Sequence, residues 1–185
     1  MAPKPTPVVT ASATPTPTTS TISIQPVKVD PDSPSEKLLK ILKAGNWVEF
    51  GKPTAPLVYA FIDPECSHCH QFIADLREKK SYETSDIRTR LLPVGIMGKE
   101  SLYEAAKLID ELHPQKAFFD HMDGDEFALP VDEKYNIQKV QENMAIMQDW
   151  ELDVTPFVIY RNKMGQVKII RGRPKDIDAL LTDIK

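Results

Sequence analysis

Several features of other protein classes are missing from this chain of 185 residues. No apolar run reaches the roughly 18 residues that a membrane-spanning helix needs, and the first residues, MAPKPTPVV, lack the apolar stretch of a signal peptide. Basic charge is not in excess either, because Lys plus Arg number 23 against 27 for Asp plus Glu, a formal net charge of -4. The charge balance therefore gives no reason to expect a nucleic-acid partner. Met1 is expected to be either a native start or a start placed after a removed export signal.

The first 34 residues contain no glycine and no aromatic residue, yet they hold 8 of the 16 prolines. From Thr10 to Thr21 the chain consists only of Thr, Pro, Ser and Ala, with nothing large to bury. We expect residues 1–32 to form a disordered tail of extended polyproline character. This tail is either an inert leader or a tether that holds the body away from a membrane anchor.

The body begins with a helix signal, in which Ser33 is the N-cap, Pro34 the first helical residue and Glu36 the end of a capping box. Residues 33–52 are expected to form a linker helix and a lead-in. After them, LVYAFI at 57–62 predicts a strand buried on both faces. The later pattern predicts a helix from about 67 to 80, a strand at 87–94, helices within 99–148, an antiparallel hairpin at 157–161 and 167–170, and a last helix from Pro174. This α/β order is the thioredoxin pattern with a helical insertion at about 97–150, so residues 53–185 are expected to form one such domain.

Both cysteines lie in one short motif, Cys66-Ser67-His68-Cys69-His70. Such a pair is a redox dithiol, half of a metal site or a haem attachment point. The haem reading of C-x-x-C-H takes His70 as an axial ligand, and the metal-carrier reading takes the thiolates with a nearby histidine. Neither reading explains the buried strand directly before Cys66. His113 and His121 have no convincing ligand spacing and are expected at the surface.

The position of the motif at the start of a helix favours the redox reading. Backbone N–H groups and the positive end of the helix dipole stabilise a thiolate there, so Cys66 is expected to have a lowered pKa and to act as nucleophile. Cys69, one turn later, is the expected resolving thiol. His68 and its neighbour Ser67 are expected to tune the thiolate, since a protonated His68 would place a positive charge near it. The active disulfide then needs no further cofactor and no metal.

A second motif lies 86 residues beyond, in Val154-Thr155-Pro156-Phe157. A proline at the head of an apolar strand cannot donate a ladder hydrogen bond. In thioredoxin-like sites this proline is cis and packs against the dithiol, which leaves the backbone of the residue before it free to pair with a substrate. We therefore predict a cis bond between Thr155 and Pro156, with Thr155 and Pro156 as substrate-binding residues.

Together, FIDPECSHCHQF, VTPFVIY and the helical block between them resemble the DsbC/DsbG family of periplasmic thiol:disulfide interchange proteins, from about residue 36 to 185. The resemblance implies Cys66 as nucleophile, Cys69 as resolving cysteine and Pro156 as the cis-proline. Thioredoxin has a buried acid six residues before its first cysteine, where this chain has Ala60. Asp63 and Glu65 lie nearer the site and are candidate proton relays.

The resemblance also implies exported protein substrates, a periplasmic location and a membrane redox partner of DsbD or DsbB type. Two departures qualify it. Well-known members are dimers built on an N-terminal domain, whereas this chain has the Thr/Pro tail in that place, so we expect a monomer. The Ser67-His68 pair resembles the oxidising DsbA type, so a DsbA-like dithiol oxidase is the alternative to an isomerase or reductase.

Overall fold

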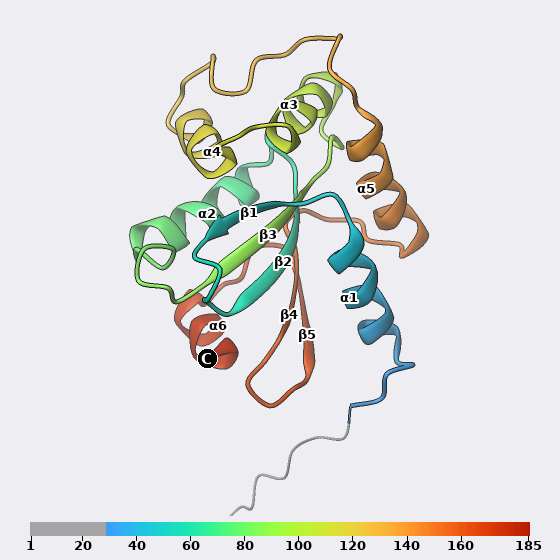
Figure 1. The fold of residues 1–185 in the computed structure, drawn as a ribbon, viewed down its shortest axis with the longest axis vertical. Helices are drawn as coiled ribbons and strands as arrows, with labels where there is room; N and C mark the ends of the chain where they lie inside the picture. Colours follow the sequence, from blue (N-terminus) through green and yellow to red (C-terminus); the bar gives the residue numbers. More distant parts are fainter. Residues whose placement is uncertain (1–28) are drawn as a thin grey trace, which may run out of the picture.

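The computed structural model describes residues 29–185 (Figure 1). The predicted tail lies almost entirely outside these residues, so its disorder stays a prediction. The elements in chain order are α1 (Pro34–Ala44), β1 (Val48–Gly51), β2 (Leu57–Ile62), α2 (Ser67–Glu78), β3 (Arg88–Pro93), α3 (Lys99–Ile109), α4 (Pro114–Met122), α5 (Gln138–Asp149), β4 (Phe157–Arg161), β5 (Val167–Arg171) and α6 (Ile177–Ile184).

The strands form one mixed sheet in the order β1-β3-β2-β4-β5. β2 lies at its centre, parallel to β3 and antiparallel to β4. The outer strands β1 and β5 pair antiparallel with β3 and β4. This arrangement, with three helices inserted between β3 and β4, confirms the predicted thioredoxin fold.

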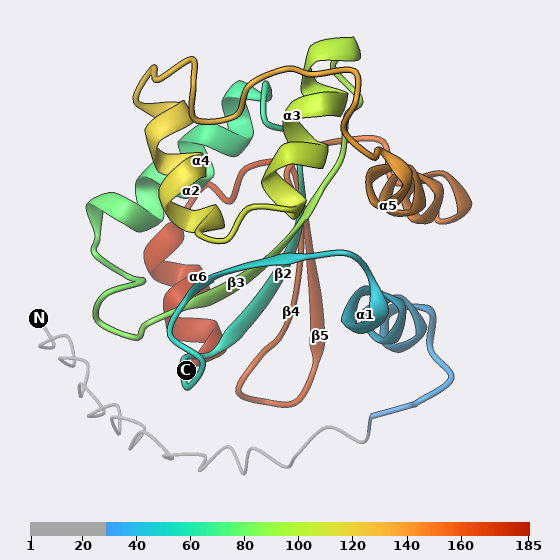
Figure 2. The same cartoon turned by 45° about the horizontal axis from the view of Figure 1, so that its top comes forward.

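Side chains of β2 alternate between two cores, as the period of a strand requires. Val58, Ala60 and Ile62 enter the core that also contains residues of α2, α4 and α6. Tyr59 and Phe61 enter the core shared with α1 and α5. Figures 1 and 2 show these two helical layers on opposite faces of the sheet. The uninterrupted apolar sequence of β2 follows from this burial on both faces.

Three predicted details differ from the structure at helix ends. Ser33 caps α1 by accepting from the Glu36 N–H at 3.4 Å, but the capping box is incomplete because the Glu36 carboxylate pairs with Arg161 instead. α2 ends at Glu78 rather than near residue 80. The last helix begins at Ile177 rather than at Pro174, because the Asp176 side chain caps it through the N–H of Ala179.

The expected linker helix, α1, packs directly on the sheet. Leu38, Leu39 and Leu42 are buried in the same core as Tyr59 and Phe61. The linker role of residues 33–52 stays a prediction, while in the structure α1 covers one face of the domain.

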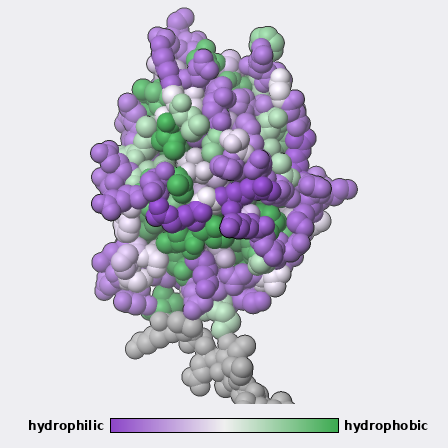
Figure 3. All heavy atoms as spheres, turned by 180° about the vertical axis from the view of Figure 1, so that it is seen from behind, coloured by the Kyte–Doolittle hydropathy of each residue, from purple (hydrophilic) through white to green (hydrophobic). Residues whose placement is uncertain are grey.

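The exterior is mostly hydrophilic on the face seen in Figure 3, where hydrophobic side chains show as small patches between charged ones. Within residues 29–185, no helix combines the length and the apolar character needed to cross a membrane.

Candidate active site

β2 and α2 together position the dithiol. β2 ends at Ile62, a turn follows, and Cys66 becomes the N-cap of α2 with extended backbone angles. Its N–H donates to the Asp63 carbonyl at 3.0 Å, and its own carbonyl accepts from the N–H groups of Cys69 and His70, each at 3.0 Å. Both cysteines are free thiols, with Cys66 6% exposed and Cys69 fully buried.

The surroundings of Cys66 lower the pKa of its thiol to about 5. The largest cause is a hydrogen bond from the Cys69 thiol, which outweighs the opposing effect of burial. The Thr155 side chain and the backbone N–H groups of Cys69 and His68 lower the pKa further. Cys66 is therefore a thiolate at neutral pH, the reactive form in nucleophilic attack and metal binding.

The second thiol differs sharply from the first. Burial raises the pKa of Cys69, and the neighbouring Cys66 sulfur and its negative charge raise it further. Cys69 thus keeps its proton while Cys66 is ionised. Two thiols in such different environments divide the chemistry between them, because Cys66 is ionised and slightly exposed, whereas Cys69 is neutral and fully buried.

The predicted cis bond between Thr155 and Pro156 is confirmed. Both residues are buried, and Pro156 leads directly into β4 beside the central strand. In its protonated form the Cys66 thiol donates a weak hydrogen bond to the backbone carbonyl of Thr155, with sulfur and oxygen 3.4 Å apart. Residues 89 positions apart are in this way brought into contact at one edge of the site.

Ser67 and His68 occupy the first turn of α2 and are exposed. His68 contributes its backbone N–H to lowering the pKa of Cys66, and tuning by its imidazole stays a prediction. A shallow hollow beside this turn is lined by His68, Gln71, Arg171, Gly172, Arg173 and Lys175. In this hollow Arg171 pairs with Asp153, and Arg173 pairs with Asp75.

Asp63 is completely buried, not exposed at a turn. One carboxylate oxygen accepts from the N–H of Glu65 at 2.9 Å, and the other accepts from the N–H groups of Ile96 and Met97 at 2.7 and 2.9 Å. These three backbone N–H donors satisfy the hydrogen-bonding capacity of the Asp63 carboxylate in the interior. They tie the turn before Cys66 to the segment that follows β3, while the proton-relay role stays a prediction.

Two histidines contact the same turn from the side of the helices. The Nε2 atoms of His70 and His121 both donate to the Pro64 carbonyl, the latter at 3.2 Å. The His70 ring also packs edge-on against Phe118, so its imidazole has a structural contact rather than a free axial-ligand position. His113 is exposed as expected, but the surface assignment of His121 is wrong, since its side chain is only 12% exposed.

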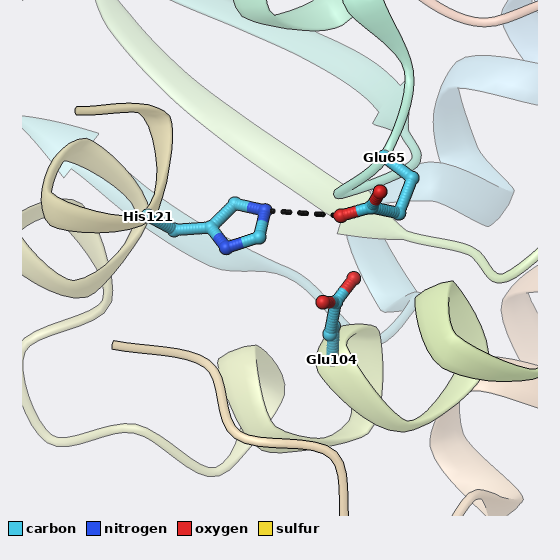
Figure 4. A group of neighbouring side chains, drawn as sticks. All are labelled: Glu65, Glu104 and His121. Carbon is cyan, nitrogen blue, oxygen red and sulfur yellow. Dashed lines mark ion pairs between the residues drawn. The ribbon is translucent and has the colours of Figure 1, made fainter. Parts of the chain in front are cut away.

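Glu65 points toward these helices, with a carboxylate oxygen 3.4 Å from Nε2 of His121. Glu104 of α3 lies beside this pair (Figure 4). Burial and the charge of Glu65 raise the pKa of Glu104 to about 8. Neither Glu104 nor His121 was predicted as a site residue. The signal in the sequence was the spacing Ser101-Glu104-Ala105-Leu108, a second buried face of α3 that includes a carboxylate.

A five-stranded sheet, a dithiol at a helix N-terminus and a cis-proline opposite it define a thioredoxin-fold protein. Residues 47–185 match the family model described as a thioredoxin-like domain, and the chain belongs to that family.

Among curated proteins, the chain is 25% identical over 149 residues to the thiol:disulfide interchange protein DsbG of Pseudomonas aeruginosa, covering 76% of this chain and 56% of that protein. It is 28% identical over 138 residues to DsbG of Escherichia coli, covering 72% of this chain and 55% of that protein. The resemblance drawn from the sequence is thus confirmed. The chain spans little more than half the length of these relatives.

Solved structures share the fold. The catalytic domain of Proteus mirabilis ScsC superposes with a TM-score of 0.58 at 17% identity, covering 79% of this chain and 95% of that one. The thiol-disulfide exchange protein alpha-DsbA2 of Wolbachia pipientis superposes with a TM-score of 0.59 at 17% identity, covering 81% and 94%.

Proposed function

We propose that this protein is a thiol:disulfide oxidoreductase that acts on exported proteins through Cys66 and Cys69. The observation that carries the proposal is the Cys66 sulfur, whose pKa is lowered to about 5 at the N-terminus of α2, in contact with the backbone before the cis-proline. The similarity to two DsbG proteins supports the same chemistry.

In the reductive direction, the Cys66 thiolate attacks one sulfur of a substrate disulfide. A mixed disulfide forms, the substrate S–S bond breaks, and the other substrate sulfur leaves as a thiolate. Cys69 then loses its proton and attacks the Cys66 sulfur, which closes the Cys66–Cys69 disulfide and releases a substrate dithiol. The negative charge of Cys66, one cause of the raised pKa of Cys69, disappears in the mixed disulfide, so the second thiol becomes easier to ionise when it is needed.

Substrate backbone is proposed to lie along Thr155, in front of Pro156. The hollow lined by His68, Arg171 and Arg173 adjoins the same turn and would receive flanking residues of the substrate. Dithiol and disulfide are the only redox groups required, so no cofactor enters the scheme.

Isomerase or reductase action, as in DsbC/DsbG proteins, requires a reductant that returns Cys66 and Cys69 to the dithiol form. We propose that this reductant is a membrane partner of DsbD type and that the reaction takes place in the periplasm. The alternative is a monomeric DsbA-like oxidase, reoxidised by a partner of DsbB type. The alternative is favoured by the strongly lowered pKa of Cys66, because stabilising the thiolate makes the disulfide more oxidising.

Two assays run on the same preparation distinguish these functions. One measures refolding of a scrambled-disulfide protein and the other measures oxidation of a peptide dithiol, each with the oligomeric state determined. Isomerase action predicts activity in the first assay only as an assembly, and oxidase action predicts activity in the second as a monomer. The reduction potential is expected on the oxidising side of about -270 mV, the value of thioredoxin.

Variants test the roles of the two cysteines. Cys66→Ala is expected to abolish both activities. Cys69→Ala is expected to accumulate a mixed disulfide with substrate, visible on a non-reducing gel, because nothing resolves it. Full activity of Cys66→Ala would refute the proposed chemistry.

A further inference from the structure

A cluster of three potential metal ligands lies on the far side of the turn that precedes Cys66. Glu65 comes from that turn, Glu104 from α3 and His121 from α4. Their ligand atoms all lie within 4.8 Å of one another. Figure 4 shows the two carboxylates and the imidazole pointing toward one another from three separate elements.

The environment of Glu104 is a second, independent observation that points to a cation. Glu104 is only 8% exposed, and its Oε2 atom has no hydrogen-bond partner among the described residues. A buried carboxylate oxygen without a hydrogen-bond partner, next to a second carboxylate, is unfavourable unless a cation neutralises the pair or the two carboxyl groups of Glu104 and Glu65 share a proton in a hydrogen bond. The carboxylate of Asp63, two residues before Glu65, shows the contrast, because all three of its hydrogen bonds are made within the protein.

The spacing of the ligand atoms fits a small divalent cation. Two ligands at about 2.1 Å from a tetrahedral Zn²⁺ ion lie about 3.4 Å apart. The atoms of His121 and Glu65 are separated by that same 3.4 Å, and Glu104 needs only a side-chain adjustment to join them. Nε2 of His121 also donates to the Pro64 carbonyl, so metal binding requires the proton of the imidazole to move to Nδ1.

The ligand types select the kind of metal. One imidazole and two carboxylates suit Zn²⁺ and related first-row divalent ions, whereas Mg²⁺ and Ca²⁺ prefer oxygen alone and Cu⁺ prefers sulfur. Three protein ligands leave a fourth position open for water. We propose that Glu65, Glu104 and His121 form a binding site for a divalent transition-metal cation such as Zn²⁺, distinct from the dithiol.

Binding at this site would join the dithiol turn to two of the inserted helices. Glu65 precedes Cys66 directly, while α3 and α4 belong to the segment inserted between β3 and β4. Because the ligands come from three elements, the bound ion would stabilise the folded protein over the unfolded chain.

The test uses full-length, tag-free protein with the Cys66–Cys69 disulfide closed, so that the thiolates cannot bind the metal. Calorimetric titration with Zn²⁺ is expected to show one ion per chain, and Zn²⁺ is expected to raise the melting temperature. Glu104→Gln and His121→Gln are each expected to weaken binding at least tenfold. Glu78→Gln at the exposed C-terminal end of α2 and His113→Gln at the start of α4 are matched controls, expected to bind within twofold of the unaltered protein.

A second measurement guards against a variant that does not fold. Co²⁺ added to the oxidised, unaltered protein is expected to give visible d–d absorption without a thiolate charge-transfer band. The proposal is overturned if oxidised protein binds neither ion, as expected when Glu65 and Glu104 merely share a proton. It is equally overturned if the control substitutions abolish binding as fully as the substitutions in the site. Disulfide exchange by Cys66 is measured separately and is untouched by either result.

Discussion

The hydrogen bond from Cys69 to Cys66 can be tested by removing its donor. Cys69→Ala deletes the thiol that is the largest cause of the lowered pKa of Cys66, while Cys69→Ser keeps a donor of similar size at the same place. The chain has only two cysteines, so either variant leaves Cys66 as the single thiol to titrate. The comparison isolates one hydrogen bond from the effects of burial and of the helix N-terminus.

The size of the effect follows from the energy of such a bond. A hydrogen bond to a charged group contributes about 1.5–3 kcal/mol, and one pKa unit corresponds to about 1.36 kcal/mol. Its loss should raise the pKa of Cys66 by about 1–2 units, from about 5 to about 6–7 in Cys69→Ala, and much less in Cys69→Ser. At pH 6 the thiolate fraction would then fall by about two- to tenfold in the alanine variant.

The assay is the pH dependence of alkylation by iodoacetamide, followed together with thiolate absorbance near 240 nm. The midpoint of the titration is the quantity to compare, because the plateau rate also changes with the intrinsic nucleophilicity of the sulfur. Equal midpoints for the alanine and serine variants would refute the assignment of this hydrogen bond. Midpoints near the ordinary value of about 8.5 in both would show that the Thr155 side chain and the backbone N–H groups of α2 do no more than offset the effect of burial on the pKa of Cys66.

Three further outcomes are expected from urea unfolding. Because folding lowers the pKa of Cys66 to about 5, the reduced protein should have a larger free energy of unfolding than Cys66→Ser. This difference should be complete above the pKa of the unfolded thiol, about 2–3 kcal/mol at pH 7, and lost as the pH falls through 5. A difference that does not change with pH would contradict the lowered pKa. Asp63→Asn should lower the free energy of unfolding by about 2–4 kcal/mol, because the amide N–H₂ group must then face a backbone N–H donor. A loss below about 0.5 kcal/mol would argue against the three hydrogen bonds that the Asp63 carboxylate accepts. Leu42→Ala should lower the free energy of unfolding by about 2–5 kcal/mol, because Leu42 is fully buried. Its neighbour Ile41 is 37% exposed, so Ile41→Ala should lower it by less than about 1 kcal/mol. Equal losses would mean that α1 is not part of the core.

The sequence predicted the fold because its strongest signals are local. The uninterrupted apolar run at 57–62 and the hairpin predicted at 157–161 and 167–170 are short and apolar, as buried strands are, and the observed bounds agree within a residue. Helix ends were less certain, as Pro174 shows. A proline suits a first helical turn, yet Asp176 caps the helix that forms. Both residues give plausible start signals, and only packing of Ile177 against the core decides between them.

The residues of the candidate site that lie in sequence motifs were predicted, whereas the residues that reach the site through distant contacts were not. Cys66 and Cys69 belong to a motif at a strand-to-helix junction, and Pro156 belongs to a motif at the head of an apolar strand. Glu104 and His121 meet Glu65 only because two inserted helices pack over the dithiol turn. A local pattern does not predict that packing, since the three residues belong to three separate elements of the chain.

The turn that leads into the dithiol is positioned by side chains that contact the backbone of two other segments, which explains how its geometry is kept. On one side the Cys66 sulfur lies 3.4 Å from the carbonyl oxygen of Thr155, the residue before the cis-proline. On the other, Asp63 binds the N–H groups of the segment at 96–97, which then turns directly into α3. Gly95 makes this path possible, because a Cβ there would lie 2.3 Å from the Cα of Leu102 and force α3 away. The segment inserted between β3 and β4 therefore fixes the position of the turn before Cys66. A larger residue at position 95 would displace α3 and weaken the hydrogen bonds of Asp63 without contacting either cysteine.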